Sequence, residues 1–327
     1  MPRFLDRPAL FLELVVLFEG IMAFKFYNKF GMRIFLFVLA ILIMSSEALA
    51  VEQSILDTQD LIVVYDSGLE PTGRQAAAEY PAIKQELETL FQWVVDFQPT
   101  LVMLKDNKRF QNLAGHELVI AYALPKKNMM VIDYSKMNTS PFVLRTTIKH
   151  ELCHLVLHHY IRDENLPRWL DEGICQWASD GFADIIMDIK RNRLPAAILS
   201  DTQFDLERLQ NHFPQDTNAL MLAYEQSKSV VEYLSVEYGP QGILDFLKLL
   251  QQGYDLESAF ERRFAISFDE FQYRWRAHLK KNINWFTYLS IHLYEILFVS
   301  AALLTIWGFA RKMVRRRAYS AEEDEQN

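Results

Sequence analysis

Apolar residues in the first half of the chain recur in short runs that favour strands. The runs are rich in β-branched residues and cover residues 61–66, 100–105, 116–123 and 128–134. Residues 124–127 would connect the last two runs. Residues 74–95 instead place apolar side chains three and four positions apart, which predicts a long amphipathic helix. This half of the chain therefore predicts a small sheet with a helix packed beside it.

The second half of the chain changes to helical spacing. After Ser179 the expected helices cover residues 204–212, 218–238, 241–251, 255–264 and 268–280, with Gly239-Pro240 and Gly253 as breaks. Strands followed by a run of helices are typical of an α+β fold.

Two apolar stretches near the ends of the chain predict export and a membrane anchor. Residues 32–50 combine a basic start, an eleven-residue apolar run and an Ala-x-Ala site, which predicts a signal peptide cleaved after Ala50. An uncleaved anchor is the alternative. Residues 1–31 would be an N-terminal extension, which is not translated if synthesis begins at Met32. Residues 285–310 are long and apolar enough to cross a bilayer once.

Charge then gives the expected orientation. Arg311, Lys312 and the three arginines after them follow the apolar stretch, so the tail, residues 311–327, should face the cytoplasm. Residues 51–284 would then form an extracytoplasmic domain. The net charge of −8 and the lack of a basic patch before this tail argue against a nucleic-acid partner.

Candidate chemistry is concentrated between His150 and Trp177. His150-Glu-Leu-Cys-His154 is an HExxH motif, and two histidines four residues apart share one face of a helix. Apolar residues at helical spacing precede the motif, with Ser140 as an N-cap and Pro141 as the first helical residue. Seventeen residues separate the motif from Glu172, which lies early in a second helix opened by Pro167.

These residue types match a zinc site. His150, His154 and Glu172 would hold Zn²⁺ and leave a fourth position for water, as in catalytic zinc sites. Glu151 would take a proton from that water. A metzincin is excluded, because its pattern needs glycine and histidine where this chain has Leu157 and Tyr160.

The motif together with Leu166-Pro-Arg-Trp-Leu-Asp-Glu-Gly173 resembles the gluzincin metallopeptidases, in particular the peptidase MA-like family. This resemblance implies a zincin-like fold, in which a small mixed sheet lobe and a helical lobe enclose a cleft floored by the motif helix. It implies a zinc peptidase acting on a peptide or protein substrate, with residues 129–133 as an edge strand that holds the substrate. It further suggests Tyr224 as a donor to the developing oxyanion. Gln176 stands where many gluzincins have an aspartate that orients a histidine, and its amide oxygen could accept the same hydrogen bond.

Two questions stay open at this level. Cys153 and Cys175, which flank the ligands, would form a disulfide or remain two buried thiols. The domain would be either a membrane-anchored zinc peptidase acting on exported proteins or a non-catalytic binding module of the same fold at the cell envelope. The intact Glu151 favours the peptidase, whereas the change at Gln176 leaves room for the binding module.

Overall fold

The computed structural model describes residues 53–137, 143–179, 193–282 and 293–325, with side chains up to residue 313. The predicted extension (1–31), signal peptide (32–50) and helix start (Ser140 and Pro141) lie outside the described residues.

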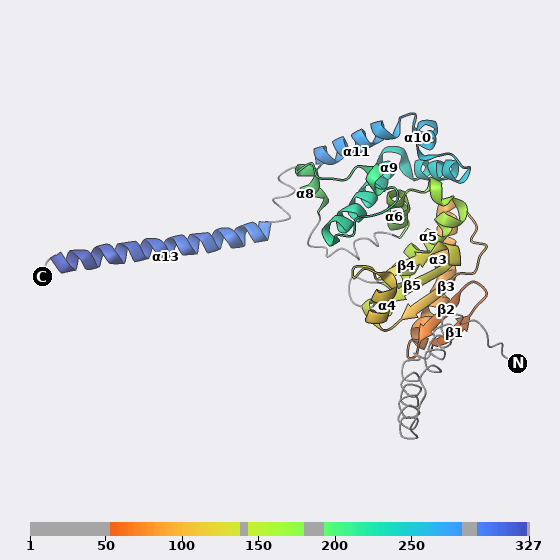
Figure 1. Cartoon of the computed structure of the whole chain (residues 1–327), viewed down its shortest axis with the longest axis horizontal. Coiled ribbons are helices and arrows are strands. Elements are labelled where there is room, and N and C mark those ends of the chain that lie inside the picture. Colours follow the sequence, from red (N-terminus) through yellow and green to blue (C-terminus); the bar gives the residue numbers. More distant parts are fainter. Residues whose placement is uncertain (1–52, 138–142, 180–192, 283–292, 326–327) are drawn as a thin grey trace, which may run out of the picture. The chain divides into compact units, whose positions relative to one another are not determined.

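One mixed sheet of five strands forms the first lobe, in the order β1-β2-β3-β5-β4 (Figure 1). The strands are Gln53–Asp57 (β1), Ile62–Asp66 (β2), Thr100–Leu104 (β3), Ala121–Leu124 (β4) and Met129–Asp133 (β5). β2, β3 and β5 are parallel, whereas β1 and β4 run antiparallel to their neighbours. The four predicted strands are confirmed, although β4 begins five residues later than expected. β1 was not predicted, because its short sequence is largely exposed and lacks a regular apolar pattern.

The prediction that residues 129–133 form the edge strand is wrong. β5 is internal, paired with β3 on one side and β4 on the other, and four of its five residues are buried. A short 3-10 turn, Pro125–Lys127, folds β4 back antiparallel onto the outer side of β5. β4 is therefore the strand at this end of the described sheet, and it packs against α5 (Leu144–Tyr160), the helix that carries the motif.

Two helices cover the sheet core. α3 (Glu70–Phe91) begins and ends four residues before the predicted helix, because Pro71 suits its first turn and Gln92 adopts a left-handed conformation that ends it. α5 begins at Leu144, since Val143 is extended. Every residue from His150 to Leu157 is buried, so α5 is enclosed on all sides at the motif.

The second lobe is helical, as predicted. Its helices are α6 (Arg168–Ala178), α8 (Leu194–Leu199), α9 (Thr217–Gln251), α10 (Leu256–Phe264) and α11 (Phe268–Asn282). Gly239 has φ 73° and interrupts α9 before Pro240, which confirms two helices divided at that dipeptide. α8 was not predicted; the carboxylate of Glu225 accepts from the backbone N–H groups of Arg193 and Leu194 at its start.

The predicted helix over residues 204–212 is wrong, and only a 3-10 turn, Leu206–Leu209, forms there. The Gln226 side chain both donates to and accepts from the Phe204 backbone, at 3.0 and 2.9 Å. Gln272 accepts from the backbone N–H of Leu206. These side chains satisfy backbone groups that a helix would otherwise pair internally.

Glycine allows α6 to approach α9 closely. A Cβ at Gly173 would lie 2.4 Å from the backbone oxygen of Ser227 and 2.7 Å from a methyl group of Val231. No other residue type fits this contact without moving one of the helices. The glycine that follows Glu172 therefore fixes the position of that carboxylate relative to α9.

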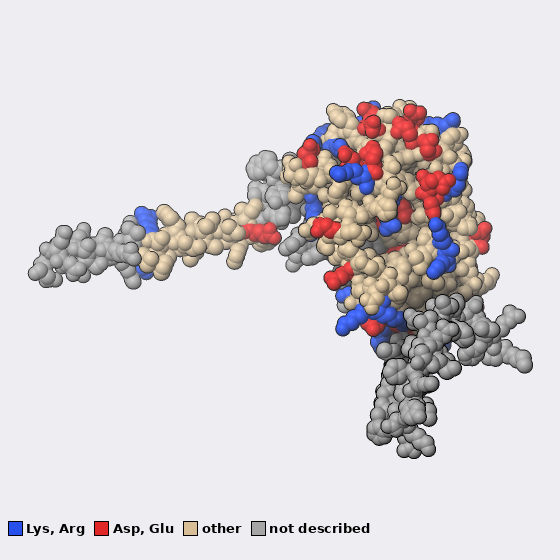
Figure 2. Space-filling view, viewed as in Figure 1, with Lys and Arg blue, Asp and Glu red and all other residues tan. Residues whose placement is uncertain are grey.

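The last described helix is α13 (Leu293–Glu325). Its first 21 residues, Leu293–Met313, are apolar enough to cross a membrane, with a mean hydropathy of 1.8, and none of the most apolar window is buried against the rest of the chain. Figure 2 shows charged residues only toward the two ends of this apolar stretch, while Lys and Arg are interspersed with Asp and Glu on the visible face of the two lobes. The first part of the predicted span, residues 285–292, lies outside the described residues.

Candidate active site

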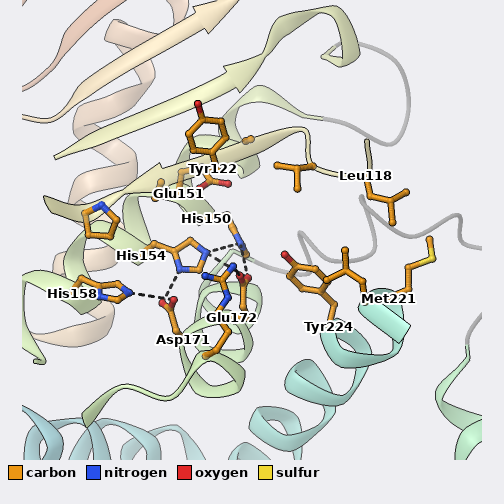
Figure 3. A pocket seen from close by; sticks show the side chains of 16 residues that line it. Leu118, Tyr122, His150, Glu151, His154, His158, Asp171, Glu172, Met221 and Tyr224 are labelled. Atoms are coloured by element: carbon orange, nitrogen blue, oxygen red, sulfur yellow. Dashed lines mark hydrogen bonds and ion pairs between the residues drawn. The ribbon is translucent and has the colours of Figure 1, made fainter. Parts of the chain in front are cut away.

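The three predicted ligands converge at one point between the lobes (Figure 3). The Nε2 atoms of His150 and His154 are 3.1 Å apart. The Oε2 atom of Glu172 is 3.7 Å from the first and 3.6 Å from the second. All three side chains are buried. The spacing on α5 and the start of α6 at Arg168 therefore bring the three candidate ligand atoms together.

These residues fit a zinc ion. Tetrahedral ligands about 2.0–2.2 Å from zinc lie about 3.4 Å from one another, close to the three observed separations. The Nδ1 atom of His154 donates to Asp171 Oδ1 at 2.7 Å, and that of His150 faces Ser179 Oγ at 3.4 Å. Because this network places a ring proton on each Nδ1, the two Nε2 atoms face each other in a buried site, where a shared proton or a metal ion can lie between them. Asp171 and Glu172 favour positive charge at this point, which a zinc ion would supply.

Asp171 is a candidate site residue that the sequence reasoning missed. Its second oxygen, Oδ2, lies 3.3 Å from His158 Nε2, so the carboxylate bridges two histidines of α5. The available signal was an acidic residue directly before Glu172 on α6, which packs against α5. Outer partners of this kind fix the orientation of a ligand imidazole and raise its basicity.

Gln176 does not have the orienting role suggested for it. Its side chain is buried, but neither amide atom makes a hydrogen bond to any residue that the structure describes. Ser179, one turn further on, instead faces His150, and its hydroxyl donates to the backbone oxygen of Cys175 at 2.7 Å. Both ligand histidines are thus supported without Gln176.

His158 extends this network toward the surface of the protein. Its Nδ1 atom lies 2.7 Å from Asp163 Oδ1. A continuous hydrogen-bonded chain therefore connects His154 through Asp171 and His158 to the exposed carboxylate of Asp163.

Burial and charge shift the pKa values of these groups. Burial raises the pKa of Glu151 to about 8, and the nearby carboxylates of Glu172 and Asp171 add to this while His154 opposes it. Burial alone would lower the pKa of His154, but Asp171 and Glu172 outweigh it and raise the value to about 10. Burial likewise would raise the pKa of Glu172, yet Arg168 and the two histidines hold it below its ordinary value. The site thus favours an ionised third ligand, and positive charge at the site would favour ionised Glu151.

A cavity of about 130 Å³ opens onto these residues. Glu151 and Tyr224 both line it, and Figure 3 shows Tyr224 reaching toward the candidate ligands from the first turns of α9. The edge strand β4 and the segment before it form the opposite wall, with Leu118 and Tyr122. Arg168 also lines the cavity and donates to Glu172 Oε1 at 2.8 Å.

Both cysteines are buried free thiols, so the disulfide alternative is not what the structure contains. The Sγ atom of Cys175 lies 3.4 Å from His154 Nδ1. Burial raises the pKa of Cys175 well above its ordinary value, and Cys153 adds to the rise. The Cys175 side chain therefore fills space behind the candidate ligands as a neutral group, and Cys153 is buried as well.

The fold and the site together define an α+β protein of the metallopeptidase type, with an HExxH helix and a glutamate ligand on the following helix. The sequence matches the family model of the Peptidase MA superfamily over residues 111–281, which is more than half of the chain. The chain belongs to this superfamily, as its motifs had suggested. No curated protein matches it.

Several solved metallopeptidase structures resemble the chain at low sequence identity. The M1 zinc metallopeptidase from Deinococcus radiodurans is 14% identical, with a TM-score of 0.39, and the match covers 71% of this chain and 52% of that one. Native yeast LTA4 hydrolase is 14% identical, with a TM-score of 0.40, and the match covers 70% of this chain and 38% of that one. Legionella pneumophila aminopeptidase A in complex with aspartic acid is 13% identical, with a TM-score of 0.42, and the match covers 69% of this chain and 28% of that one. The chain thus spans about half or less of the length of these proteins.

Proposed function

We propose that this chain is a membrane-anchored zinc metallopeptidase that hydrolyses peptide bonds of exported proteins or peptides. The observation that carries the proposal is the pair of facing Nε2 atoms of His150 and His154, completed by Glu172 and adjoined by Glu151 in one cavity. Membership of the Peptidase MA superfamily supports the same reaction class.

The residues of the site divide the reaction between them. A bound zinc ion supplies Lewis acidity, which polarises a carbonyl group and makes water a stronger acid. Glu151 accepts the proton of the attacking water and passes it to the leaving amine. Asp171 and Ser179 keep both Nε2 atoms directed at the cavity by binding the opposite ring nitrogens.

Tyr224 is the proposed donor to the oxyanion. Burial raises the pKa of its hydroxyl, and the carboxylate of Glu172 adds to this, so the group stays protonated throughout the neutral range. A neutral hydroxyl directed into a partly closed cavity can stabilise the negative charge that develops on the carbonyl oxygen.

The edge strand β4 is the proposed support for the substrate. It is the last strand of the described sheet on this side, and its residues Ala121, Tyr122 and Ala123 line the cavity. A substrate backbone could pair with the unpaired side of β4 and so lie extended across the ligands.

The membrane anchor is proposed from α13. The large apolar side chains between Leu293 and Met313 are exposed, and an environment of lipid would remove them from water. Glu295 lies in the first turn, where it can reach the bilayer surface, and Arg311 and Lys312 follow the apolar stretch on the side proposed to be cytoplasmic. Recovery of the full chain in the supernatant after alkaline carbonate extraction of membranes would contradict this anchor.

The substitution Glu151→Gln tests the proposed reaction on the purified full chain. Zinc content should remain one ion per chain, while peptide hydrolysis should fall by at least about 100-fold because the general base is lost. Glu164→Gln, which changes an exposed glutamate on the same side of the site, should leave hydrolysis unchanged. Zinc should be lost in His150→Ala and in Glu172→Ala. Undiminished hydrolysis in Glu151→Gln would refute the mechanism, and a zinc-loaded wild type without any peptidase activity would favour the binding module.

A further inference from the structure

Arg168 places a permanent positive charge on the wall of the catalytic cavity. Among the described residues that line the cavity, Arg168 is the one lysine or arginine. The other titratable groups of the lining are three histidines, three carboxylates and two tyrosines. Its side chain is 47% exposed, whereas that of its partner Glu172 is only 4% exposed. The guanidinium therefore lies at the boundary between the buried ligand set and the space that a substrate would enter.

The contacts of Arg168 hold this side chain in place but do not use all its donors. One nitrogen donates to Glu172 Oε1 at 2.8 Å, and a second contact is with the Tyr224 hydroxyl. The ring of Phe213 lies under the guanidinium, 5.7 Å from centroid to Cζ. A guanidinium carries five N–H donors in a planar fork, so donors remain for another partner. That fork matches a carboxylate in a two-point hydrogen-bonded pair.

The position relative to the ligands limits where such a carboxylate can lie. Arg168 holds one oxygen of Glu172, while the other oxygen of the same carboxylate lies 3.6 Å from His154 Nε2. The carboxylate of Glu172 alone thus separates the guanidinium from the ligand atoms, beside which the carbonyl of the scissile bond must lie. An extended peptide advances about 3.3–3.6 Å per residue, so a group held by Arg168 belongs to a residue next to that bond or one further on.

Much of the remaining cavity wall is apolar, and Arg168 is the one guanidinium among its described residues. Leu118, Val119, Leu220 and Met221 line it beside Tyr224. Asp171 is already bound to two histidines, and Glu172 is bound to Arg168, so neither carboxylate faces the cavity uncompensated. A substrate with apolar side chains and one carboxylate complements this surface.

We propose that Arg168 binds a carboxylate of the substrate within one or two residues of the scissile bond. This inference deepens the proposed peptidase function and rests on the same cavity. The carboxylate has two possible sources, the free carboxyl terminus of a peptide or the side chain of an aspartate or glutamate. The first source would make the enzyme a carboxypeptidase or a dipeptidase-like exopeptidase, and the second an endopeptidase with acidic preference.

Binding can be measured without turnover on the zinc-loaded full chain carrying Glu151→Gln. The probes are acetylated tetrapeptides of alanine, leucine and phenylalanine, prepared with a free carboxyl terminus and as the carboxamide. A second amidated pair carries aspartate or asparagine at one internal position. Calorimetry should show that one carboxylate-bearing probe binds about 10- to 100-fold more tightly than its neutral partner, as expected for hydrogen bonds to a charged group. Which pair shows the difference identifies the source.

Variants at Arg168 then assign the preference. Arg168→Gln, in the Glu151→Gln background, should abolish the difference between the probes, and Arg168→Lys should retain part of it because the charge remains. Arg262→Gln is the matched control, since Arg262 lies over the ring of Tyr254 at 4.4 Å and does not line the cavity. Zinc content is measured in each variant, so that a lost ligand set is recognised separately.

The outcomes are decisive in either direction. Equal affinity within both pairs would overturn the inference, as would a preference that persists in Arg168→Gln. An equal loss of affinity for charged and neutral probes in Arg168→Gln would mean that Arg168 only positions Glu172. Turnover by the otherwise unchanged chain is a separate measurement: if no probe is cleaved but the preference through Arg168 remains, the peptidase function fails while carboxylate recognition stands.

Discussion

Removing the carboxylate of Asp171 should weaken zinc binding without removing any zinc ligand. The two oxygens of Asp171 accept from His154 Nδ1 at 2.7 Å and from His158 Nε2 at 3.3 Å in a buried setting. Asp171→Ala loses both bonds and leaves the His154 N–H without this acceptor. Outer partners of this kind alter metal affinity by about 10- to 100-fold, or about 1.4–2.7 kcal/mol. The short, charge-assisted bond to His154 places this variant near the upper value.

A graded series separates the two bonds. Asp171→Asn keeps an acceptor oxygen for His154 but presents an N–H to His158, so affinity should fall by about tenfold. His158→Ala removes only the longer bond and should lower affinity by a few-fold at most. Asp201→Asn, which alters an exposed carboxylate paired with Lys280, is the control and should change nothing.

Competition between the protein and a chromophoric chelator gives the zinc dissociation constant for each variant. Thermal unfolding with excess chelator shows whether the metal-free fold is intact, which separates a lost fold from a weakened site. Wild-type affinity in a folded Asp171→Ala protein would refute the reasoning. An equal loss in His158→Ala and Asp171→Ala would show that the shorter bond has no special weight.

Three further predictions test the packing, the donor and the charge network. Gly173→Ala should lower the free energy of unfolding by about 2–3 kcal/mol in a denaturant titration, because its Cβ would meet the α9 backbone at 2.4 Å. Gly115→Asn is the control: Gly115 has a left-handed conformation and open space around it, so this change should leave the free energy of unfolding nearly unchanged. Tyr224→Phe should reduce kcat by about 100- to 1,000-fold in steady-state assays with unchanged zinc content, and an unchanged kcat would remove Tyr224 from the mechanism. Burial alone would raise the pKa of Glu86, but Lys149 and Arg145 outweigh it and lower the value. Its stabilising contribution is therefore present above the unfolded pKa of about 4.3 and disappears as the pH falls through the lower folded value. Glu86→Gln should thus be less stable than wild type by under about 1 kcal/mol at pH 7, and the difference should vanish once the pH is below the folded pKa.

The parts of the site that could be predicted from sequence are those fixed by local geometry. His150 and His154 share a helix face at any location in a fold, and Pro167 sets where α6 begins, so Glu172 could be placed in its second turn. Asp171 was overlooked because an aspartate is common near a helix start and its target lies on another helix.

Other features depend on contacts between distant segments and were not visible in the sequence. The order of β5 and β4 in the sheet depends on how Pro125–Lys127 folds β4 back beside β5, and this was not recognised from the sequence. Gln226 and Gln272, from two later helices, keep residues 204–206 out of a helix. Val94 belongs to the apolar spacing that predicted a helix up to residue 95, but α3 ends before it and its side chain is exposed.

The close contact at Gly173 also bears on how the protein matures. All three proposed ligands and the proton acceptor come from residues 150–172, on two helices joined by a short connection, so bringing them together closes only a small loop. Tyr224 joins them only when α9 docks against α6, which needs the much later part of the chain. Assembly of the proposed ligand set therefore requires less of the chain than assembly of the complete proposed catalytic site.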